Sequence, residues 1–540
     1  MASYTSLLFR DDARAKLLAG AEALADAVRP TLGPESRSVL IDKKFGDPIV
    51  CDDGVTIARQ LTMRDPEENL GVEMLRKASI TTNDEVGDGT TTSTLLAHAI
   101  LKEGLRNVVA GSSAVAIRRG LDTATQTVVD ELRRLARPVK GTKDTADVAT
   151  VSAHNDPAVG QMVADAVDRV GSDGIVEVEQ ARGMETELDV VEGFQIDKGY
   201  LSAYFATEPE SMEAELEDPL VLVFEKKITT IASIVPLLEQ VMQAGRALVI
   251  VAETVEGEAL ATLVINKARG AVRVVAVKAP GFGDRRKEML RDLAILTGGR
   301  VISEETGDKL ENVSIDDLGS AAKVVVDRDE TIVIGGGGDP AAVRGRQDEL
   351  RRQIADTTSD WDREKLEERL AKLTGQVAVI RVGAPTEVEL ERLKEAYDDA
   401  INSTRAAIEE GIVPGGGSAL LRAIPTLDQL SRELDGDERI GVLVLREALA
   451  VPARQLALNV GADPGVVVDR IGQETGFFGF DARTRAYGQM DELGIIDPTK
   501  VVRTALERAV AVAGVLLLAE ATMTEIEEPE PAQPFPPELH

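Results

Sequence analysis

The chain has 540 residues, 43% of them hydrophobic and 29% charged, which is typical of a globular protein of two or three domains and excludes a disordered chain. Its formal net charge of −32 disfavours binding to nucleic acid or to an anionic membrane, because both need a basic surface. A single cysteine excludes an internal disulfide framework, and three histidines leave a zinc cluster almost without ligands.

Neither an export signal nor a membrane span is predicted. The N-terminal stretch reaches Arg10-Asp11-Asp12 before a signal-peptide core can form. The longest apolar run, residues 509–519, is much shorter than the roughly 20 residues that a membrane-spanning helix needs, and it predicts a buried helix instead. We therefore expect a cytoplasmic protein without membrane contact.

The first 137 residues have a mostly helical pattern. Apolar residues three or four positions apart predict a helix over 13–28, which Pro30 ends. Two short apolar runs, at 39–41 and 49–50, predict the strands of a hairpin. Further helices are predicted at 60–82, 92–109 and 114–137.

After residue 139 the pattern changes to strands that alternate with helices. A helix is predicted at 157–170 and a strand at 174–178. Apolar runs typical of strands covered on both faces follow at 221–224, 247–252, 272–277 and 324–326. Helices are predicted between them, at 233–244, 256–268 and 284–296. This alternation indicates a β-α-β-α domain around a largely parallel sheet.

The rest of the chain returns to helices. The glycine run 335–338 is interpreted as a surface turn rather than a phosphate loop, because Asp339-Pro340 opens a helix directly after it. A helical pair follows, with a cap at Ser359, and then a strand at 377–382 and a helix at 387–410. Beyond Gly411 the pattern is again mostly helical, so the two chain ends are expected to share one domain.

The run Gly87-Asp88-Gly89-Thr90-Thr91-Thr92 carries the main chemical signal. Its glycines allow successive N–H groups to converge on an anion, and a helix that begins near Thr92 would add the positive end of its dipole. Asp88 would repel a phosphate but suits Mg²⁺, which prefers one or two carboxylates together with phosphate oxygens. The alternative is a polar turn with a threonine helix cap. Neither a Walker loop nor a dinucleotide fingerprint is present.

Together with four other motifs, this run closely resembles the group I chaperonins, the bacterial GroEL type. The motifs are Thr31-Leu32-Gly33-Pro34, Asp53-Gly54, the run 406–417 that ends in Gly415-Gly416-Gly417, and Asp497-Pro498-Thr499-Lys500. Longer passages at 189–193 and 279–287 also match, and the resemblance covers residues 9–524.

The resemblance implies the multidomain α and α/β chaperonin fold. A mostly helical equatorial domain would comprise residues 1–137 and 411–524, and a small α/β intermediate domain residues 138–192 and 376–410. An α/β apical domain would comprise residues 193–375. Residues 525–540 carry five prolines and several acids, and they are predicted to form a disordered tail.

The resemblance also implies a function. The chain would be an ATP-hydrolysing chaperone that captures unfolded polypeptides and encloses them for folding, with Mg²⁺ and K⁺ as cofactors. Its partners would be unfolded chains, a small co-chaperonin lid protein and further copies of itself in two stacked heptameric rings. The alternative is a specialised or structural paralogue that assembles and holds clients but cycles ATP weakly.

The same resemblance assigns site residues. Asp53 and Asp399 would be catalytic, with Asp399 positioning the attacking water, and Asp88 would bind Mg²⁺. The nucleotide would be held by Thr31, Leu32, Gly33, Pro34, Gly87, Asp88, Gly89, Thr90, Thr91, Thr92, Gly416, Asp481, Ala482, Arg483 and Asp497. Clients would bind Tyr200, Tyr204, Phe205, Val235, Leu238, Leu260, Val264 and Ile265. An apolar stripe such as Leu260, Val264 and Ile265 is ordinarily core, so its exposure is expected from the resemblance alone.

Three features depart from the family pattern. Asp52 stands where the group I family normally has a lysine on the phosphate side. Gln376 replaces the second of two glycines at a hinge, whereas Gly193 and Gly411 keep the hinge glycines. The tail lacks the usual Gly-Gly-Met repeats.

Overall fold

The computed structural model describes residues 4–42, 48–171, 174–181, 183–208, 211–357 and 359–526. The chain divides into two compact units. The helical unit comprises residues 1–165, 182–184 and 382–540, and the sheet unit comprises residues 166–181 and 185–381. Both chain ends lie in the helical unit, as the return of the helical pattern predicts. The finer division into three domains stays a prediction.

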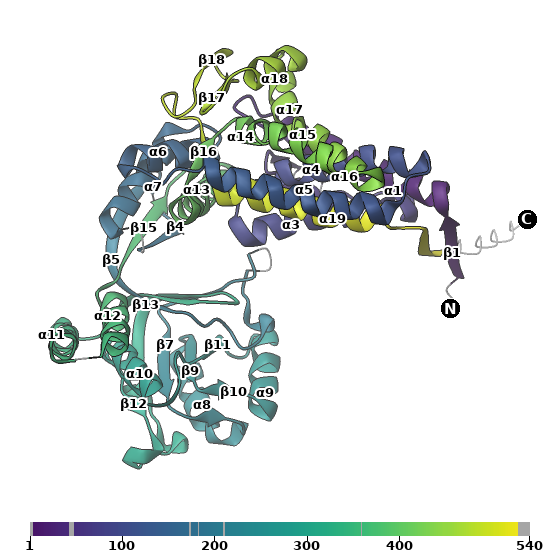
Figure 1. Ribbon diagram of the computed structural model, residues 1–540. Coiled ribbons are helices and arrows are strands. Elements are labelled where there is room, and N and C mark those ends of the chain that lie inside the picture. Colours follow the sequence, from purple (N-terminus) through teal and green to yellow (C-terminus); the bar gives the residue numbers. More distant parts are fainter. Residues whose placement is uncertain are drawn as a thin grey trace, which may run out of the picture. The chain divides into compact units, whose positions relative to one another are not determined.

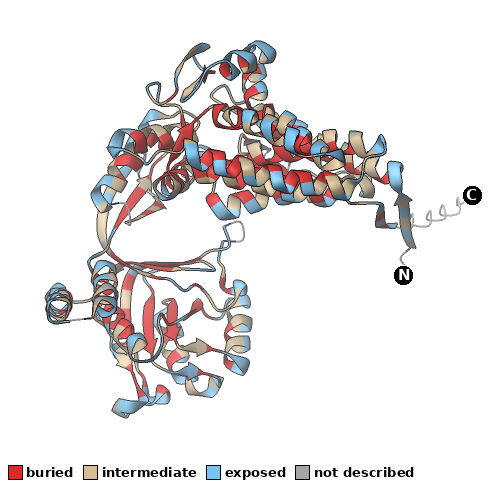
Figure 2. Cartoon of the chain, in the orientation of Figure 1, coloured by how far each residue is buried: buried red, intermediate tan, exposed pale blue. Residues whose placement is uncertain are grey.

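Long helices that pack side by side build the helical unit (Figure 1). α1 (Arg10–Val28) packs on α3 (Pro66–Val86), α4 (Thr90–Val109) on α19 (Thr499–Leu517), and α5 (Ala114–Leu135) on α16 (Gly436–Ala448). Figure 2 shows buried residues along the facing sides of these helices. The apolar run at 509–519 mostly belongs to the buried helix that its composition predicts. Among the described residues no helix is long and apolar enough to cross a membrane.

Further helices and short antiparallel strand pairs complete this unit. The helices are α2 (Gly54–Gln60), α6 (Gly141–Ser152), α7 (Pro157–Val170, whose last residues fall in the sheet unit), α13 (Glu387–Glu410), α14 (Ser418–Arg422), α15 (Ile424–Glu433), α17 (Val451–Asn459) and α18 (Pro464–Gly472). The antiparallel strand pairs are β1 (Tyr4–Phe9) with β20 (Ala521–Ile526), β2 (Val39–Ile41) with β3 (Ile49–Cys51), β16 (Ile412–Pro414) with β19 (Ile496–Pro498), and β17 (Phe478–Asp481) with β18 (Ala486–Gln489).

One prediction at the end of this unit needs correction, and one of its helices was not predicted. Glu525 and Ile526 belong to β20 rather than to a disordered tail, because β20 pairs with β1 through these residues. The remainder of the predicted tail, 527–540, lies outside the described residues. Helix α6 was not predicted, because its run of threonines, aspartates and a lysine carries little apolar periodicity.

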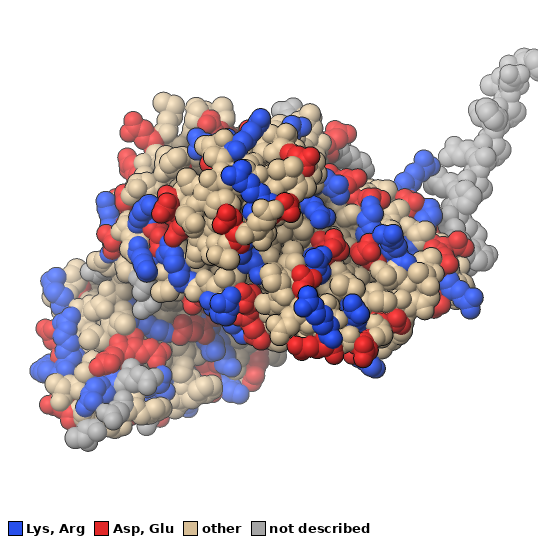
Figure 3. All heavy atoms as spheres, turned by 45° about the horizontal axis from the view of Figure 1, so that its top comes forward, with Lys and Arg blue, Asp and Glu red and all other residues tan. Residues whose placement is uncertain are grey.

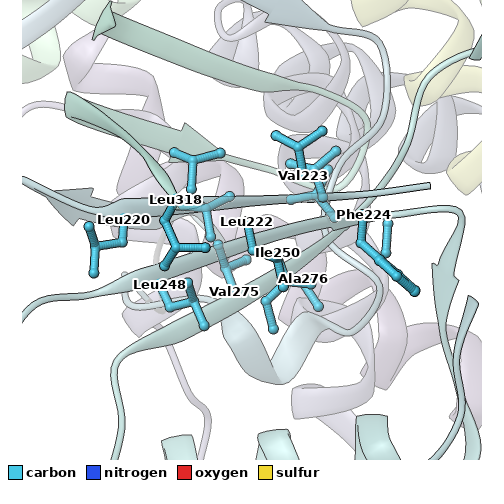
Figure 4. Packing of buried hydrophobic residues seen from close by; sticks show 14 of the residues in the cluster. Leu220, Leu222, Val223, Phe224, Leu248, Ile250, Val275, Ala276 and Leu318 are labelled. Carbon is cyan, nitrogen blue, oxygen red and sulfur yellow. The ribbon is translucent and has the colours of Figure 1, made fainter. Parts of the chain in front are cut away.

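A ten-stranded sheet forms the second unit. Its main path is β11 (Val274–Lys278), β9 (Leu248–Ala252), β7 (Leu220–Phe224), β13 (Gly319–Val326), β14 (Thr331–Gly336), β5 (Glu187–Ile196), β15 (Gln376–Val382) and β4 (Ile175–Gln180), while β12 (Val301–Ile302) and β6 (Ala214–Glu217) pair beside it. The contiguous strands β7, β9 and β11 run parallel, and Figure 4 shows their closely packed aliphatic side chains.

The sheet is mixed rather than largely parallel. β13 runs antiparallel to β7, and β14 and β5 continue the antiparallel pairing. The apolar runs predict burial on both faces correctly, but apolar composition does not reveal strand direction. β13 and β14 form an antiparallel pair that is not joined by a crossover helix. The predicted helices are α8 (Val235–Ala244), α9 (Gly257–Ala268) and α10 (Gly283–Thr297), and the helical pair is α11 (Pro340–Asp356) and α12 (Asp360–Thr374).

Glycines set the distance between the long helices. A Cβ added at Gly20 would lie 1.8 Å from a carbonyl oxygen of α3, and one at Gly71 would lie 2.1 Å from a carbonyl oxygen of α1. The crossing of α5 and α16 repeats this arrangement, with Gly120 and Gly441 at 1.9 and 2.2 Å. The helix backbones therefore touch at these points, and a methyl group would push them apart.

We expect Gly20→Ala to lower the free energy of unfolding by about 2–3 kcal/mol, although alanine is the better helix former by about 1 kcal/mol. The control is Gly472→Ala in α18, where a Cβ meets nothing within 4 Å. That change should be neutral or stabilising by up to about 1 kcal/mol. Denaturant unfolding of both variants measures the difference, and equal stabilities would contradict backbone contact at the crossing.

Candidate functional site

A deep pocket in the helical unit gathers residues from well-separated stretches of the chain. Its lining includes Thr31, Leu32, Gly33, Pro34, Asp53, Gly87, Asp88, Gly89, Thr90, Thr91, Thr92, Asp399, Gly416, Asp481, Ala482 and Asp497. Of the residues predicted to hold the nucleotide or to be catalytic, only Arg483 is outside the lining; it is exposed on the β17–β18 turn.

The loop between α3 and α4 forms one wall. Gly87 ends α3 with φ +67°, and Gly89 precedes α4 with φ +79°, both in the left-handed region that favours glycine. Helix α4 begins at Thr90, two residues earlier than predicted. A Cβ at Gly87 would lie 2.3 Å from Asn402 Nδ2, so α13 is seated directly against this loop. The first N–H groups of α4 have no carbonyl partner within the helix, so they can donate hydrogen bonds to an anion.

A second loop, residues 31–34, meets the first. Thr31 Oγ1 lies 3.1 Å from Thr91 Oγ1, and Asn459 Nδ2 donates to the carbonyl oxygens of Arg29 and Leu32 at 2.9 and 2.8 Å. A Cβ at Gly54 would lie 2.3 Å from Thr91 Oγ1, which brings the start of α2 against the same threonine. Three backbone segments thus converge around one hydroxyl.

The two acids beside these loops are held differently. Asp53 caps α2, because its carboxylate accepts from the N–H groups of Val55 and Thr56 at 3.2 and 2.7 Å. The carboxylate of Asp88 accepts three hydrogen bonds, one from the backbone N–H of Gly89 and two from serine hydroxyls of α6 and α13. Asp53 therefore has a local structural role as a helix cap, and its side chain also lines the pocket.

Crowded carboxylates dominate the electrostatics of the pocket. Burial raises the pKa of the Asp399 carboxyl well above its usual range, and the charges of Asp88 and Asp53 raise it further. Burial, together with Asp88, raises the pKa of Asp497 to about 7. Asp52 also lines the pocket. A cation would relieve this repulsion. Elsewhere the charges are interspersed, as on the face in Figure 3.

A magnesium ion fits this donor set. The described residues hold no cluster of three or more His, Cys, Asp or Glu side chains arranged for a metal. Mg²⁺ does not need such a cage, because it usually binds through one or two carboxylates and completes its shell with phosphate oxygens and water. Asp88, beside a loop with free helix N-terminal donors, meets that requirement.

Several lining residues were not identified from the sequence. Val151, Ser152, His154 and Asn155 come from the end of α6 and the turn after it. His154 and Asn155 have φ values of +52° and +64°, an unusual conformation for residues other than glycine. Hydrophobic periodicity does not predict such a turn. The only signal in the sequence is the asparagine, a residue type that tolerates left-handed backbone angles. A second histidine, His98, is buried, and burial lowers its pKa to about 4.

The β17–β18 turn is stabilised by one of the predicted nucleotide ligands. Asp481 Oδ1 accepts from the backbone N–H groups of Arg483 and Thr484 at 2.8 and 3.3 Å, and Oδ2 accepts from Thr484 Oγ1 at 2.5 Å. The carboxylate of Asp481 therefore stabilises the turn. Because it is occupied in this way, a ligand would contact the backbone of Asp481 and Ala482 instead.

The residues predicted to bind clients lie in the sheet unit and differ in exposure. Tyr204, Ile265 and Val235 are 77%, 49% and 37% exposed. Tyr200, Leu238, Leu260 and Val264 are half-buried and pack against the core.

The prediction for Phe205 is wrong, because this residue is fully buried. The short helical turn Ala203–Phe205 points Tyr204 outward and Phe205 into the core.

Comparison with known proteins finds similarity over nearly the whole chain. The model of the TCP-1/cpn60 chaperonin family matches residues 24–527. A relative named Chaperonin GroEL 5, from Bradyrhizobium diazoefficiens, is 57% identical over 528 residues, which cover 98% of each chain.

The raised pKa of Asp497 predicts that this residue lowers the free energy of unfolding by an amount that depends on pH. An unfolded aspartate has a pKa of about 3.9, so between roughly pH 4 and pH 7 the folded chain keeps a proton that the unfolded chain has lost. The carboxyl therefore destabilises the fold increasingly as pH rises through this window. We expect Asp497→Asn to raise the melting temperature more at pH 8 than at pH 5. An equal gain at both pH values would contradict the raised pKa.

Proposed function

Because the chain belongs to the TCP-1/cpn60 chaperonin family, it is an ATP-dependent chaperone, and we propose that it hydrolyses ATP in the pocket of the helical unit. Hydrolysis would switch the molecule between a state that captures unfolded polypeptides and a state that encloses them. The observation that carries this proposal is the meeting of the α3–α4 glycine loop, the 31–34 loop and a group of aspartates in one pocket.

The backbone is proposed to hold the triphosphate. The N–H groups at the start of α4, supported by the loop 31–34, supply donors for phosphate oxygens, and the dipole of α4 favours their negative charge. Thr31 and Thr91 offer hydroxyls at the same place. Gly416, the backbone of Asp481 and Ala482, and Asp497 would contact the base and ribose. Gly416 lines the pocket, and its φ of +65° lies in the left-handed region that favours glycine.

The acids are proposed to bind cations and to direct water. Asp88 would ligate Mg²⁺, whose charge would neutralise the phosphate oxygens. A K⁺ ion would balance the remaining carboxylates, including Asp52. Asp399 would orient the attacking water, and its raised pKa makes its carboxylate a stronger proton acceptor than that of an ordinary aspartate. Asp53 would support it from the start of α2.

The chaperone cycle would need partners and domain movement. We propose an equatorial domain of residues 1–137 and 411–524, an intermediate domain of 138–192 and 376–410, and an apical domain of 193–375. Two stacked heptameric rings and a small lid protein would enclose the client, in the cytoplasm. Gly411, with φ +79°, supports a hinge at its position, because most other residues would be strained there.

Client capture is proposed at the exposed apolar residues of α8 and α9. Val235 and Ile265 expose enough apolar surface to bind chains whose common property is exposed hydrophobic groups. Tyr204 would extend this surface, and the half-buried Leu238, Leu260 and Val264 would contribute their exposed edges. Phe205 is left out, because it is core.

One observation favours weak ATP cycling as the alternative. Asp52 lines the pocket and adds negative charge near the expected phosphates. The comparisons give no preference to this reading, and a cation bound near Asp52 would offset its charge. Measured turnover in the presence of Mg²⁺ and K⁺ distinguishes the two functions.

Asp399→Ala tests the proposed hydrolysis. Because Asp399 would act on water rather than on ATP, we expect kcat to fall about 100-fold or more while the KM for ATP changes little. Glu391→Ala, which changes an exposed acid near the start of α13, is the control and should leave both unchanged. An equal loss of ATP binding and turnover in Asp399→Ala would contradict the assigned role.

The client surface is tested by Val235→Ser combined with Ile265→Ser. Capture of a denatured test protein should be largely lost, while the free energy of unfolding changes by no more than about 0.5 kcal/mol for each exposed site. Phe205→Ala is the matched contrast and should lower stability by about 3–5 kcal/mol, because it opens a cavity. Unimpaired capture by the double variant would refute this surface.

A further inference from the structure

One carboxylate oxygen in the pocket is shared by two helices. Asp88 Oδ2 accepts from Ser403 Oγ of α13 at 2.6 Å and from Ser152 Oγ at the end of α6 at 3.0 Å. The other oxygen, Oδ1, accepts from the backbone N–H of Gly89 at 2.5 Å. Neither serine belongs to the motifs that define the site, and both are hydroxyl donors aimed at the residue that would ligate Mg²⁺.

These bonds restrict how a cation can reach Asp88. An ionised carboxylate offers about four lone-pair directions. The two serines occupy both directions on Oδ2, and Gly89 occupies one on Oδ1. A single direction on Oδ1 remains. The carboxylate is therefore fixed in rotation and presents one oxygen for a single metal bond.

The same bonds fix α13 against the phosphate loop. Asp399 and Ser403 are four residues apart, so they share one face of the helix. Between them, Asn402 packs over Gly87 closely enough to exclude any side chain there. Ser403 is 0% exposed. Its hydroxyl therefore cannot replace the hydrogen bond to Asp88 with one to bulk water unless the helix moves.

We propose that Ser403, assisted by Ser152, is a positioning residue that couples the metal-binding carboxylate to the helix carrying Asp399. Ser403 directs Oδ1 of Asp88 toward the cation and, through the same bond, keeps Asp399 at the reacting end of the pocket. This inference rests on the proposed ATP hydrolysis and adds to it a hydroxyl link between metal binding and the position of α13.

Ser403→Ala removes the link with little change in volume. We expect kcat to fall about tenfold, the typical effect of losing one hydrogen bond to a charged group, with the KM for ATP changed less than about twofold. The Mg²⁺ concentration for half-maximal activity should rise severalfold. Ser152→Ala, at a half-buried position, should shift both quantities in the same direction and serves where Ser403→Ala folds poorly.

Thr404→Val provides the control. Thr404 is the next residue of α13, is 2% exposed, and has a hydroxyl without a hydrogen-bond partner among the described residues. Valine keeps its shape and removes only that hydroxyl. This variant should retain both the kcat and the Mg²⁺ dependence of the unaltered chain, whereas a general packing effect on α13 would change it as well.

Cation binding is measured separately from activity. Mn²⁺ titrated by electron paramagnetic resonance, with a non-hydrolysable ATP analogue present, should bind Ser403→Ala severalfold more weakly than the unaltered chain. Unchanged Mn²⁺ affinity, or an equal loss in Thr404→Val, would overturn the inference. If the unaltered chain hydrolyses ATP and Ser403→Ala matches it, only the role of Ser403 fails. If the unaltered chain shows no hydrolysis, the proposed function fails too.

Discussion

Close packing of side chains against the glycine backbone around the α3–α4 loop is the constraint on which the rest of the pocket depends. A side chain at Gly87 would collide with α13, and one at Gly54 would collide with Thr91. With no side chains in the way, α2, α4 and α13 come close enough for their N–H groups and short side chains to face one small volume. Phosphoryl transfer relies on positioning and charge neutralisation, which such a rigid cradle can supply.

The second constraint is charge. Two carboxylates about 4 Å apart repel by about 4 kcal/mol at an effective dielectric near 20, so a pocket lined by Asp52, Asp53, Asp88, Asp399 and Asp497 is costly without cations. Hydrogen bonds stabilise two of these carboxylates: Asp53 caps α2, and Asp88 accepts from three donors. The pKa values of Asp399 and Asp497 are raised, which favours their uncharged forms. A nucleotide that arrives with its metal would relieve this repulsion, which ties stability to ligand binding.

The sheet unit combines a buried core with exposed apolar side chains on the same two helices. Helices α8 and α9 bury one face in the core, through Leu237, Val241, Ala259 and Leu263. Their flanks carry the exposed apolar groups. The parallel strands β7, β9 and β11 are buried along almost their whole length and anchor these helices.

The sequence alone determined the local elements and most of the site. Regular apolar spacing fixes helices such as α5 and α13 to within about two residues, because that spacing reflects the burial of one face. The loop around Asp88 was recognisable from its own glycines and hydroxyls, whereas Asp399, Gly416 and Asp497 were assigned through the family resemblance, and all of them line the pocket.

Only the tertiary structure decided what meets across the chain. Asp88 is bound by serines 64 and 315 positions away, and no local pattern marks a hydroxyl as aimed at a distant carboxylate. The burial of Phe205 beside the exposed Tyr204 depends on how one short turn packs on the sheet. The antiparallel pairing of β13 with both β7 and β14 is likewise decided only in the packed sheet, since apolar composition reports burial and not direction. Spacing along a chain encodes which faces are buried, whereas the partners of a buried group are fixed only when the elements pack.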